Sequence, residues 1–151
     1  MIQVQSVRQV NLEPQSFTNG AIATLLVDTL AGGGDQYQYA TFFINLGRTN
    51  TATNVPSVLK LQSSDTTVAA TFTDVSGGSF TTGFTTGQTA GGDNLLLGVN
   101  TAIGKRYLQL LISPTTTQLV AATCVLSRPQ ASPWTTAMYN VSAPPIFLTQ
   151  A

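Results

Sequence analysis

A pair of carboxylates is the acid–base arrangement that we weigh for this chain, because the sequence contains no histidine. The usual general base at neutral pH, the common zinc ligand and the Ser-His-Asp arrangement are therefore absent together. A pair of carboxylates could still catalyse hydrolysis, and the sequence offers Asp28, Asp35, Asp65, Asp74 and Asp93. Each stands in or beside a predicted turn, where aspartate hydrogen-bonds its own backbone. We therefore expect structural aspartates and a protein that is not an enzyme.

No metal or cofactor site is expected either. Asp65 and Asp74 could face each other across a hairpin around a cation, but calcium takes about six or more oxygen ligands and no dense acidic loop supplies them. The lone Cys124 has no imidazole to activate it, and we expect it to be a buried small hydrophobe. The three glycines at 32–34 are followed by neither a lysine at Walker spacing nor a predicted helix, which indicates a turn and not a phosphate loop.

The charges are few and dispersed, and the formal net charge is zero. Nucleic-acid binding needs a clustered basic footprint, whereas Lys105 and Arg106 are the only adjacent cations, so we expect no nucleic-acid partner and interpret this pair as a solvated strand end. No apolar run approaches the roughly 20 residues that span a bilayer, and the first residues do not resemble a secretory signal. These observations predict assembly in a cytoplasm without membrane contact.

The composition indicates one folded domain with an unusually neutral surface. A chain of 151 residues with 42% apolar residues is long enough to bury a core. Only 8% of its residues are charged, against roughly 25% in a typical soluble domain. Hydroxyl and amide side chains replace the ions, and they lose less on desolvation. Such a surface suits burial against neighbours in a repeating assembly, or alternatively reflects the preference of strands for threonine.

Apolar residues alternate with period two between frequent glycines and prolines, which predicts short antiparallel strands. Residues 60–75 predict two strands joined by a turn at 64–67, and 105–113 predict a strand whose partner is 119–128. About eight strands predict an all-β antiparallel sandwich resembling a jelly roll. The side chains that we expect on inward faces are Leu108, Leu110, Ile112, Val120, Ala122, Cys124 and Leu126. On two earlier strands the alternation places Ala40, Phe42, Ile44 and Leu46 on one shared face, and Leu59 and Leu61 on another.

Three segments fall outside this pattern. Residues 1–15 form an N-terminal arm or strand, and residues 130–151 form an extended C-terminal arm that prolines keep out of a central ladder. The sandwich domain, 16–129, lies between these two arms and contains the third segment. The C-terminal arm either packs back on its own sandwich or lies across another subunit. Residues 77–93 are rich in glycine, and their Phe80 and Phe84 either fold onto the sandwich or contact a neighbouring subunit.

In their order along the chain, five stretches resemble small β-sandwich proteins of tailed-bacteriophage virions, of the head decoration or cement type. These stretches are 39–44, 59–65, 72–75, 105–110 and 126–129. The resemblance implies a virion structural protein that binds the capsid exterior and clamps adjacent major capsid protein subunits. It also implies a homo-oligomer, either a homotrimer or a homodimer.

The interface residues that we expect are apolar residues outside the predicted strands of the sandwich: Ile2, Val4, Phe80, Phe84, Trp134, Tyr139, Ile146, Phe147 and Leu148. A second hypothesis stays open, namely a carbohydrate-binding or structural module of a phage tail or fibre. In that case Trp134, Tyr37, Tyr39 and Tyr107 would stack on sugars.

Overall fold

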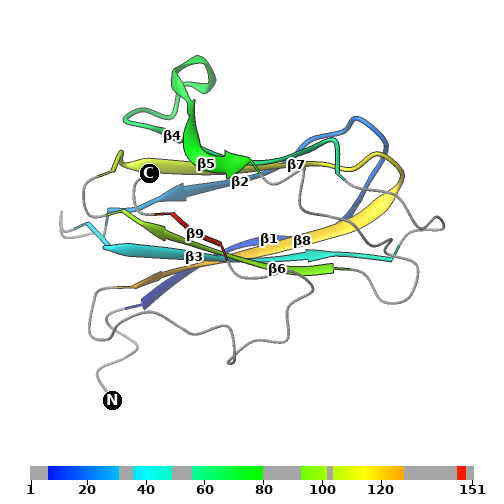
Figure 1. Ribbon diagram of the computed structural model, residues 1–151, viewed down its shortest axis with the longest axis horizontal. Helices are drawn as coiled ribbons and strands as arrows, with labels where there is room; N and C mark the ends of the chain where they lie inside the picture. The colour runs from blue at the N-terminus through cyan, green and yellow to red at the C-terminus, as the bar shows by residue number, and fades with distance from the viewer. Residues whose placement is uncertain are drawn as a thin grey trace.

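A computed structural model describes residues 7–30, 36–48, 56–79, 93–101, 104–127 and 146–148. Within them the chain is all-β, apart from a three-residue 3₁₀ turn at Ala69–Thr71. The strands form two sheets that lie face to face, as Figure 1 shows. This arrangement confirms the predicted β-sandwich.

The first sheet, called sheet A here, has the strand order β1-β8-β3-β6-β9. Its first four strands pair antiparallel, and the short β9 is added parallel to β6 at the edge. The bounds of these strands are β1 Val7–Phe17, β3 Tyr39–Leu46, β6 Asp93–Asn100, β8 Gln118–Ser127 and β9 Ile146–Leu148.

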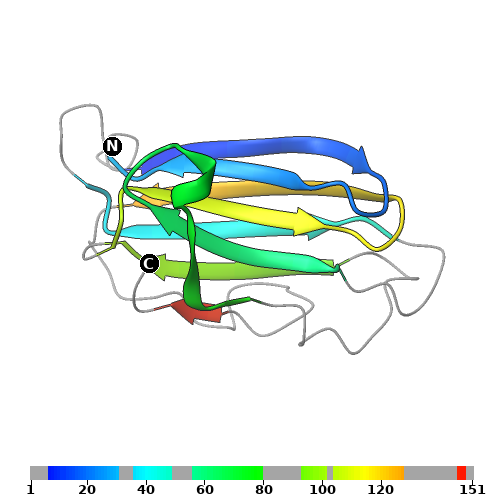
Figure 2. The same cartoon turned by 90° about the horizontal axis from the view of Figure 1, so that it is seen from above.

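The second sheet, called sheet B, has the order β2-β7-β4-β5, and all of its pairs are antiparallel. Figure 2 shows that β1 and β2 follow the same margin of the sandwich, whereas β5 and β9 lie toward the opposite margin. The bounds are β2 Ala23–Asp28, β4 Val58–Ser64, β5 Thr73–Ser79 and β7 Tyr107–Ser113.

The core lies between the two sheets and consists of alternate residues of the paired strands. Every residue that the sequence predicted for an inward face is buried, with at most 2% of its surface exposed. Val27, Leu97 and Val99 complete the core from β2 and β6. Period-two alternation places these side chains on one face of each strand, so the binary pattern of the sequence defined the core.

The pairing of β7 with β8 was predicted wrongly. These strands follow one another in the chain, but β7 pairs with β2 and β4 in sheet B, whereas β8 pairs with β1 and β3 in sheet A. The link between them therefore crosses from one sheet to the other. The β1–β2 link crosses at the same end, where the backbone N–H of Gly20 donates to the carbonyl oxygen of Pro114 at 3.2 Å.

The strand after β4 was predicted at 71–75; in the structure it is Thr73–Ser79, and a link with a 3₁₀ turn precedes it. Hydroxyl groups occupy this link. The Thr71 side chain donates to the carbonyl oxygen of Val68 at 2.7 Å and lies 2.6 Å from the Ser64 hydroxyl. Such local bonds compete with a strand ladder, and here they favour the 3₁₀ turn.

The two ends of the chain meet the sandwich in different ways. β1 includes residues on both sides of the boundary that the sequence suggested at residue 15, and it pairs with β8 over most of its length. Of the predicted C-terminal arm, only β9 lies within the described residues, and its backbone pairs with β6 of the same chain.

Candidate interaction surface

Six of the nine predicted interface residues lie outside the described residues, and the other three form β9. The register pairs Leu97 with Ile146, Gly98 with Phe147 and Val99 with Leu148. This short segment of the C-terminal arm thus contacts its own sandwich at a sheet edge. The six outside the described residues are Ile2, Val4, Phe80, Phe84, Trp134 and Tyr139.

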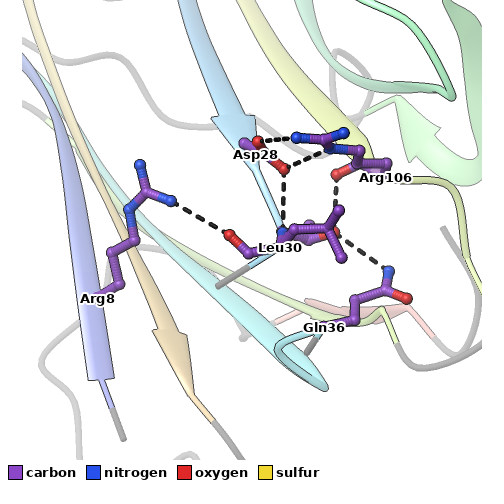
Figure 3. A network of polar contacts seen from close by, with 6 residues as sticks. Arg8, Asp28, Leu30, Gln36 and Arg106 are labelled. Carbon is purple, nitrogen blue, oxygen red and sulfur yellow. Dashed lines mark hydrogen bonds and ion pairs between the residues drawn. The ribbon is translucent and has the colours of Figure 1, made fainter. Parts of the chain in front are cut away.

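A polar network lies where β2 ends and β7 begins (Figure 3). Nε and Nη2 of Arg106 donate to the two carboxylate oxygens of Asp28 at 3.0 and 2.8 Å. The same carboxylate accepts the backbone N–H of Leu30 at 3.0 Å, which is a turn contact typical of aspartate. Arg8 of β1 donates to the carbonyl oxygen of Leu30 at 3.4 Å. The network therefore connects an edge of sheet A with sheet B.

The hydrogen-bond network continues into the interior through two buried threonines. The Thr29 hydroxyl donates to the carbonyl oxygen of Arg106 at 2.7 Å and accepts the side-chain amide of Gln36 at 3.1 Å. Gln36 also donates to the carbonyl oxygen of Thr101 at 2.9 Å, and the Thr101 hydroxyl donates to that of Tyr37. Thr29 and Thr101 are fully buried. These bonds hold the β2–β3 link against the β6–β7 link.

The electrostatics of the Asp28–Arg106 pair favour a structural role. Hydrogen bonding to the Arg106 guanidinium holds the pKa of Asp28 below its usual value, although partial burial acts in the opposite direction. Asp28 in turn raises the pKa of Arg106. A carboxylate in a bidentate ion pair with a guanidinium stays ionised and is a poor base. The pair is therefore a tie between strand ends and not a catalytic group.

A second ion pair lies on the outer side of sheet B. Nζ of Lys60 is 2.9 and 3.2 Å from the two carboxylate oxygens of Asp74, and Gln62 donates to the same carboxylate at 2.7 Å. The Lys60 hydrogen bond is the largest cause of the lowered pKa of Asp74. Asp74 lies within β5 opposite Gln62. Asp74 therefore stands in a strand, and Lys60 and Gln62 bind its carboxylate.

The adjacent cations Lys105 and Arg106 contact different parts of the sandwich. Nζ of Lys105 donates to the Thr73 hydroxyl at 2.9 Å, whereas Arg106 binds Asp28 and lies 4.8 Å above the ring centre of Tyr107. The two side chains are thus engaged by separate intramolecular partners. This geometry fits the interpretation of a strand end better than that of a phosphate clamp.

The tyrosines considered for sugar stacking do not gather on one face. Tyr37 is only 7% exposed. Tyr39 and Tyr107 alternate with the buried Ala40 and Leu108, and therefore project from the outer faces of opposite sheets. Trp134 lies outside the described residues. A stacking platform needs aromatic rings on one shared surface, and these three tyrosines do not supply it.

Acidic and metal-ligating side chains are dispersed over the described residues. No group of three or more His, Cys, Asp or Glu side chains lies together among them. Every buried side-chain nitrogen or oxygen in this part of the chain has a hydrogen-bond partner, so no buried polar group points at an absent ligand. Cys124 is buried, and its burial raises the pKa of the thiol, which makes it unreactive.

Among the strands whose side-chain exposure the structure describes, β1 is the most accessible, and its residues 7–15 belong to the segment that the sequence predicted as an N-terminal arm or strand. Eight of its eleven residues are exposed and none is buried. Its side chains are mainly neutral, and the Gln9 amide donates to Oδ1 of Asn11 at 3.0 Å. A signal was present in the sequence: residues 7–17 contain amides and charges at both alternating positions, which is typical of an edge strand.

No helix in the described ranges is long and apolar enough to cross a membrane. A scan of protein-family models, a search of curated proteins and a search of solved structures each found no match to this chain.

Proposed function

We propose that this protein is a structural component of a bacteriophage virion, which binds the outer surface of the head as a capsid decoration protein. In this proposal the sandwich is a jelly roll, and many copies stabilise the capsid lattice by bridging major capsid protein subunits. The protein performs no catalysis and needs no cofactor.

One observation carries the proposal: strands β1–β8 divide into the orders β1-β8-β3-β6 and β2-β7-β4-β5. A jelly roll is an eight-stranded double sheet built from two Greek keys, and it is common in viral capsid and lectin domains. The crossing of the β7–β8 and β1–β2 links between the sheets supports this topology. Because one fold can support several functions, the surface chemistry must also agree.

The surface chemistry agrees with a role in assembly. Outer positions of the strands carry hydroxyl and amide groups beside aliphatic ones such as Leu26 and Leu119, and Asp28 and Asp74 are neutralised by Arg106 and Lys60. Neutral polar groups lose less free energy than ions when another protein covers them. The absence of a metal cluster or an unpaired buried polar group among the described residues also favours binding over catalysis.

Repetition supplies the binding strength in the proposed mechanism. Each copy buries an interface on the order of 1,000 Å² or more against capsid subunits. Many modest contacts on one shell act together, so that overall avidity exceeds the affinity of any single contact. Residues 1–12 and the apolar residues Trp134, Tyr139, Ile146, Phe147 and Leu148 are the proposed bridging contacts. They combine aromatic and aliphatic side chains of the kind that dominate protein interfaces.

The test is cosedimentation of the full chain with empty capsids of the phage that encodes it. We expect saturable binding, and we expect that the double variant Trp134→Ala/Tyr139→Ala weakens it by about tenfold or more, as loss of an interfacial hot spot does. Tyr39→Ala is the matched control, because Tyr39 is an exposed aromatic residue on the sandwich itself. Failure of the wild-type chain to bind capsids would contradict the function, whereas binding that survives the double variant would contradict only the assigned contacts.

A further inference from the structure

We propose that β1 is a self-pairing edge: two copies of the chain join by antiparallel pairing of their β1 strands across a two-fold axis at Val10. Sheet A of one copy then continues into sheet A of the other. The pairing deepens the proposed function by specifying a contact between copies. It forms without a capsid, so it can fail or succeed independently of capsid binding.

The edge is available for a partner. Among the described strands, β1 is the outermost of sheet A and pairs on one side only, with β8. In Figure 2 it follows the margin of the sandwich along its whole length. The unpaired side of an edge strand presents backbone N–H and C=O groups that another strand can bind. Because none of its residues is buried, a second strand reaches it without displacing a covering segment.

The first half of β1 has the regular geometry that strand addition needs. Its register with β8 runs without interruption from Val7 opposite Ser127 to Leu12 opposite Ala122, and shifts only between Leu12 and Gln15. Pro14, which has no N–H to donate, lies within that irregular part. Residues 7–12 therefore form a straight stretch, and the bulge limits pairing to this half.

The other edge strands of the antiparallel sheets are less suitable. β5 has an irregular register with β4 and contains Gly77 at a φ of 74°, and such bulged, twisted edges resist strand addition. β2 has only six residues, and alternate ones are buried. β1 thus combines length, exposure and regular pairing.

A second copy of β1 complements the first in one register. With Val10 opposite Val10 of the second copy, Gln9 faces Asn11 and Arg8 faces Leu12 across the axis. Facing amides can exchange hydrogen bonds, and the aliphatic part of an arginine can cover a leucine. Gln9 and Asn11 already lie on one face, because their side chains bond within the strand.

Neighbouring symmetric registers are worse. A two-fold axis at Asn11 places Arg8 opposite Pro14 and brings the bulge into the ladder. An axis at Gln9 moves the two Arg8 side chains closer together and leaves Leu12 opposite a residue before Val7. Like charges near one another destabilise a strand pair. Only with the axis at Val10 does every residue from 8 to 12 face a residue of the same range in the second copy.

Such an interface is short, so we expect a concentration-dependent equilibrium between monomer and dimer, which the lattice of a capsid would strengthen. Sedimentation velocity of the purified full chain measures it directly. The double variant Gln9→Lys/Asn11→Lys places like charges opposite each other at both amide pairs, and we expect it to shift the dissociation constant by at least about tenfold toward monomer. The variant Gln9→Glu/Asn11→Glu should behave likewise.

An equimolar mixture of these two variants should restore the dimer, because opposite charges then face each other. The matched control is Thr24→Lys/Ser76→Lys, which adds the same charge at exposed positions of β2 and β5 and should leave the dissociation constant unchanged. A wild-type chain that stays monomeric up to about 1 mM, a trimer, or a dimer indifferent to both charged variants would overturn the proposal.

A crosslink then tests the register. Opposite residues of an antiparallel pair have Cα atoms about 4.5–5.5 Å apart, within the reach of a disulfide. The variants Gln9→Cys and Asn11→Cys should therefore give a covalent dimer when they are mixed and mildly oxidised, but little when each is oxidised alone. The native Cys124 is buried and does not compete. Equal crosslinking of each variant by itself would contradict the Val10 register.

Discussion

The strands β7 and β1 contrast the centre of the sandwich with its rim. β7 lies between β2 and β4, and its inward residues Leu108, Leu110 and Ile112 are fully buried. β1 has one neighbour, and even its inward Val10 remains partly exposed. Both are antiparallel strands with β-branched and aliphatic residues. The number of neighbouring strands, and not local propensity, therefore decides how deeply each inward side chain is buried.

The sharpest test of this contrast is truncation of one inward side chain in each strand. Leu110→Ala should lower the free energy of unfolding by about 2–5 kcal/mol, because it leaves a cavity in a fully packed core. Val10→Ala should cost about 1 kcal/mol, because less apolar surface is returned to water. Urea unfolding of both variants measures the difference. Equal losses would show that the rim is packed as tightly as the centre.

The second test concerns a close approach at the end of a central strand of sheet A. The backbone N–H of Gly47 donates to the carbonyl oxygen of Leu119 at 2.7 Å, and a Cβ on Gly47 would lie 2.8 Å from the Cβ of Leu119. Gly47→Ala should therefore force the strands apart and lower the free energy of unfolding by about 1–3 kcal/mol.

Gly20→Ala is the natural comparison for Gly47→Ala. Gly20 has a φ of +78° and open space around it. Gly20→Ala should therefore lower the free energy of unfolding only by the cost of a left-handed backbone at a residue with a Cβ, about 1–2 kcal/mol. Thermal unfolding of the two variants separates steric contact from backbone strain. If Gly47→Ala were as stable as wild type, the close approach to Leu119 would not require a glycine at position 47.

A smaller effect is expected at the Asp28–Arg106 tie. Since Arg106 lowers the pKa of Asp28, the folded protein binds this proton less readily than the unfolded chain, whose usual value is 3.8. The tie therefore stabilises the fold above that pH, and its contribution disappears as the pH falls through the lowered pKa. Asp28→Asn should destabilise the protein near pH 7 and lose most of this deficit near pH 2.

Urea unfolding at the two pH values measures that change, with Asp65→Asn as a control for an exposed aspartate in a turn. We expect Asp28→Asn at neutral pH to be milder than Leu110→Ala, because the pair is partly exposed. A deficit that stayed constant with pH would exclude the carboxylate charge as its cause.

The smallest effect should come from the pair of Lys60 and Asp74 on the outer face of sheet B. The Asp74 side chain is 59% exposed, so water and salt screen its attraction to Lys60. Asp74→Asn should change stability less than Asp28→Asn, and about 0.5 M salt should remove the remaining difference. Unfolding at low and high salt measures this, and a loss larger than that of Asp28→Asn would reverse the order.

The sequence predicted the core well because burial in a sandwich follows period two. Leu108, Ile112 and Leu126 were all assigned to inward faces and are buried. Alternation does not reveal which sheet a strand joins, and so the pairing of β7 with β8 was predicted wrongly. The 3₁₀ turn before β5 depends on hydroxyl bonds of Thr71, which propensity does not describe.

The surface was less predictable, because its contacts join residues far apart in the chain. Asp28 and Arg106 are separated by 78 positions, and no spacing rule connects them. Apolar content directed attention to Phe80, Trp134 and their neighbours, which lie outside the described residues. The sequence left residues 1–15 as either an arm or a strand, and only the pairing with β8 shows that residues 7–17 form an edge strand.

The buried Cys124 thiol can report how often the edge strand β1 opens. Cys124 lies on β8, opposite Val10 of β1 on one side and Phe42 of β3 on the other. Its strand is therefore the direct neighbour of the strand that we propose for self-pairing. A thiol reagent therefore reaches it only when β1 separates from β8 or the whole fold opens. The rate of labelling under native conditions reports the free energy of that opening, and comparison with the global free energy of unfolding separates peeling of one strand from collapse of the fold.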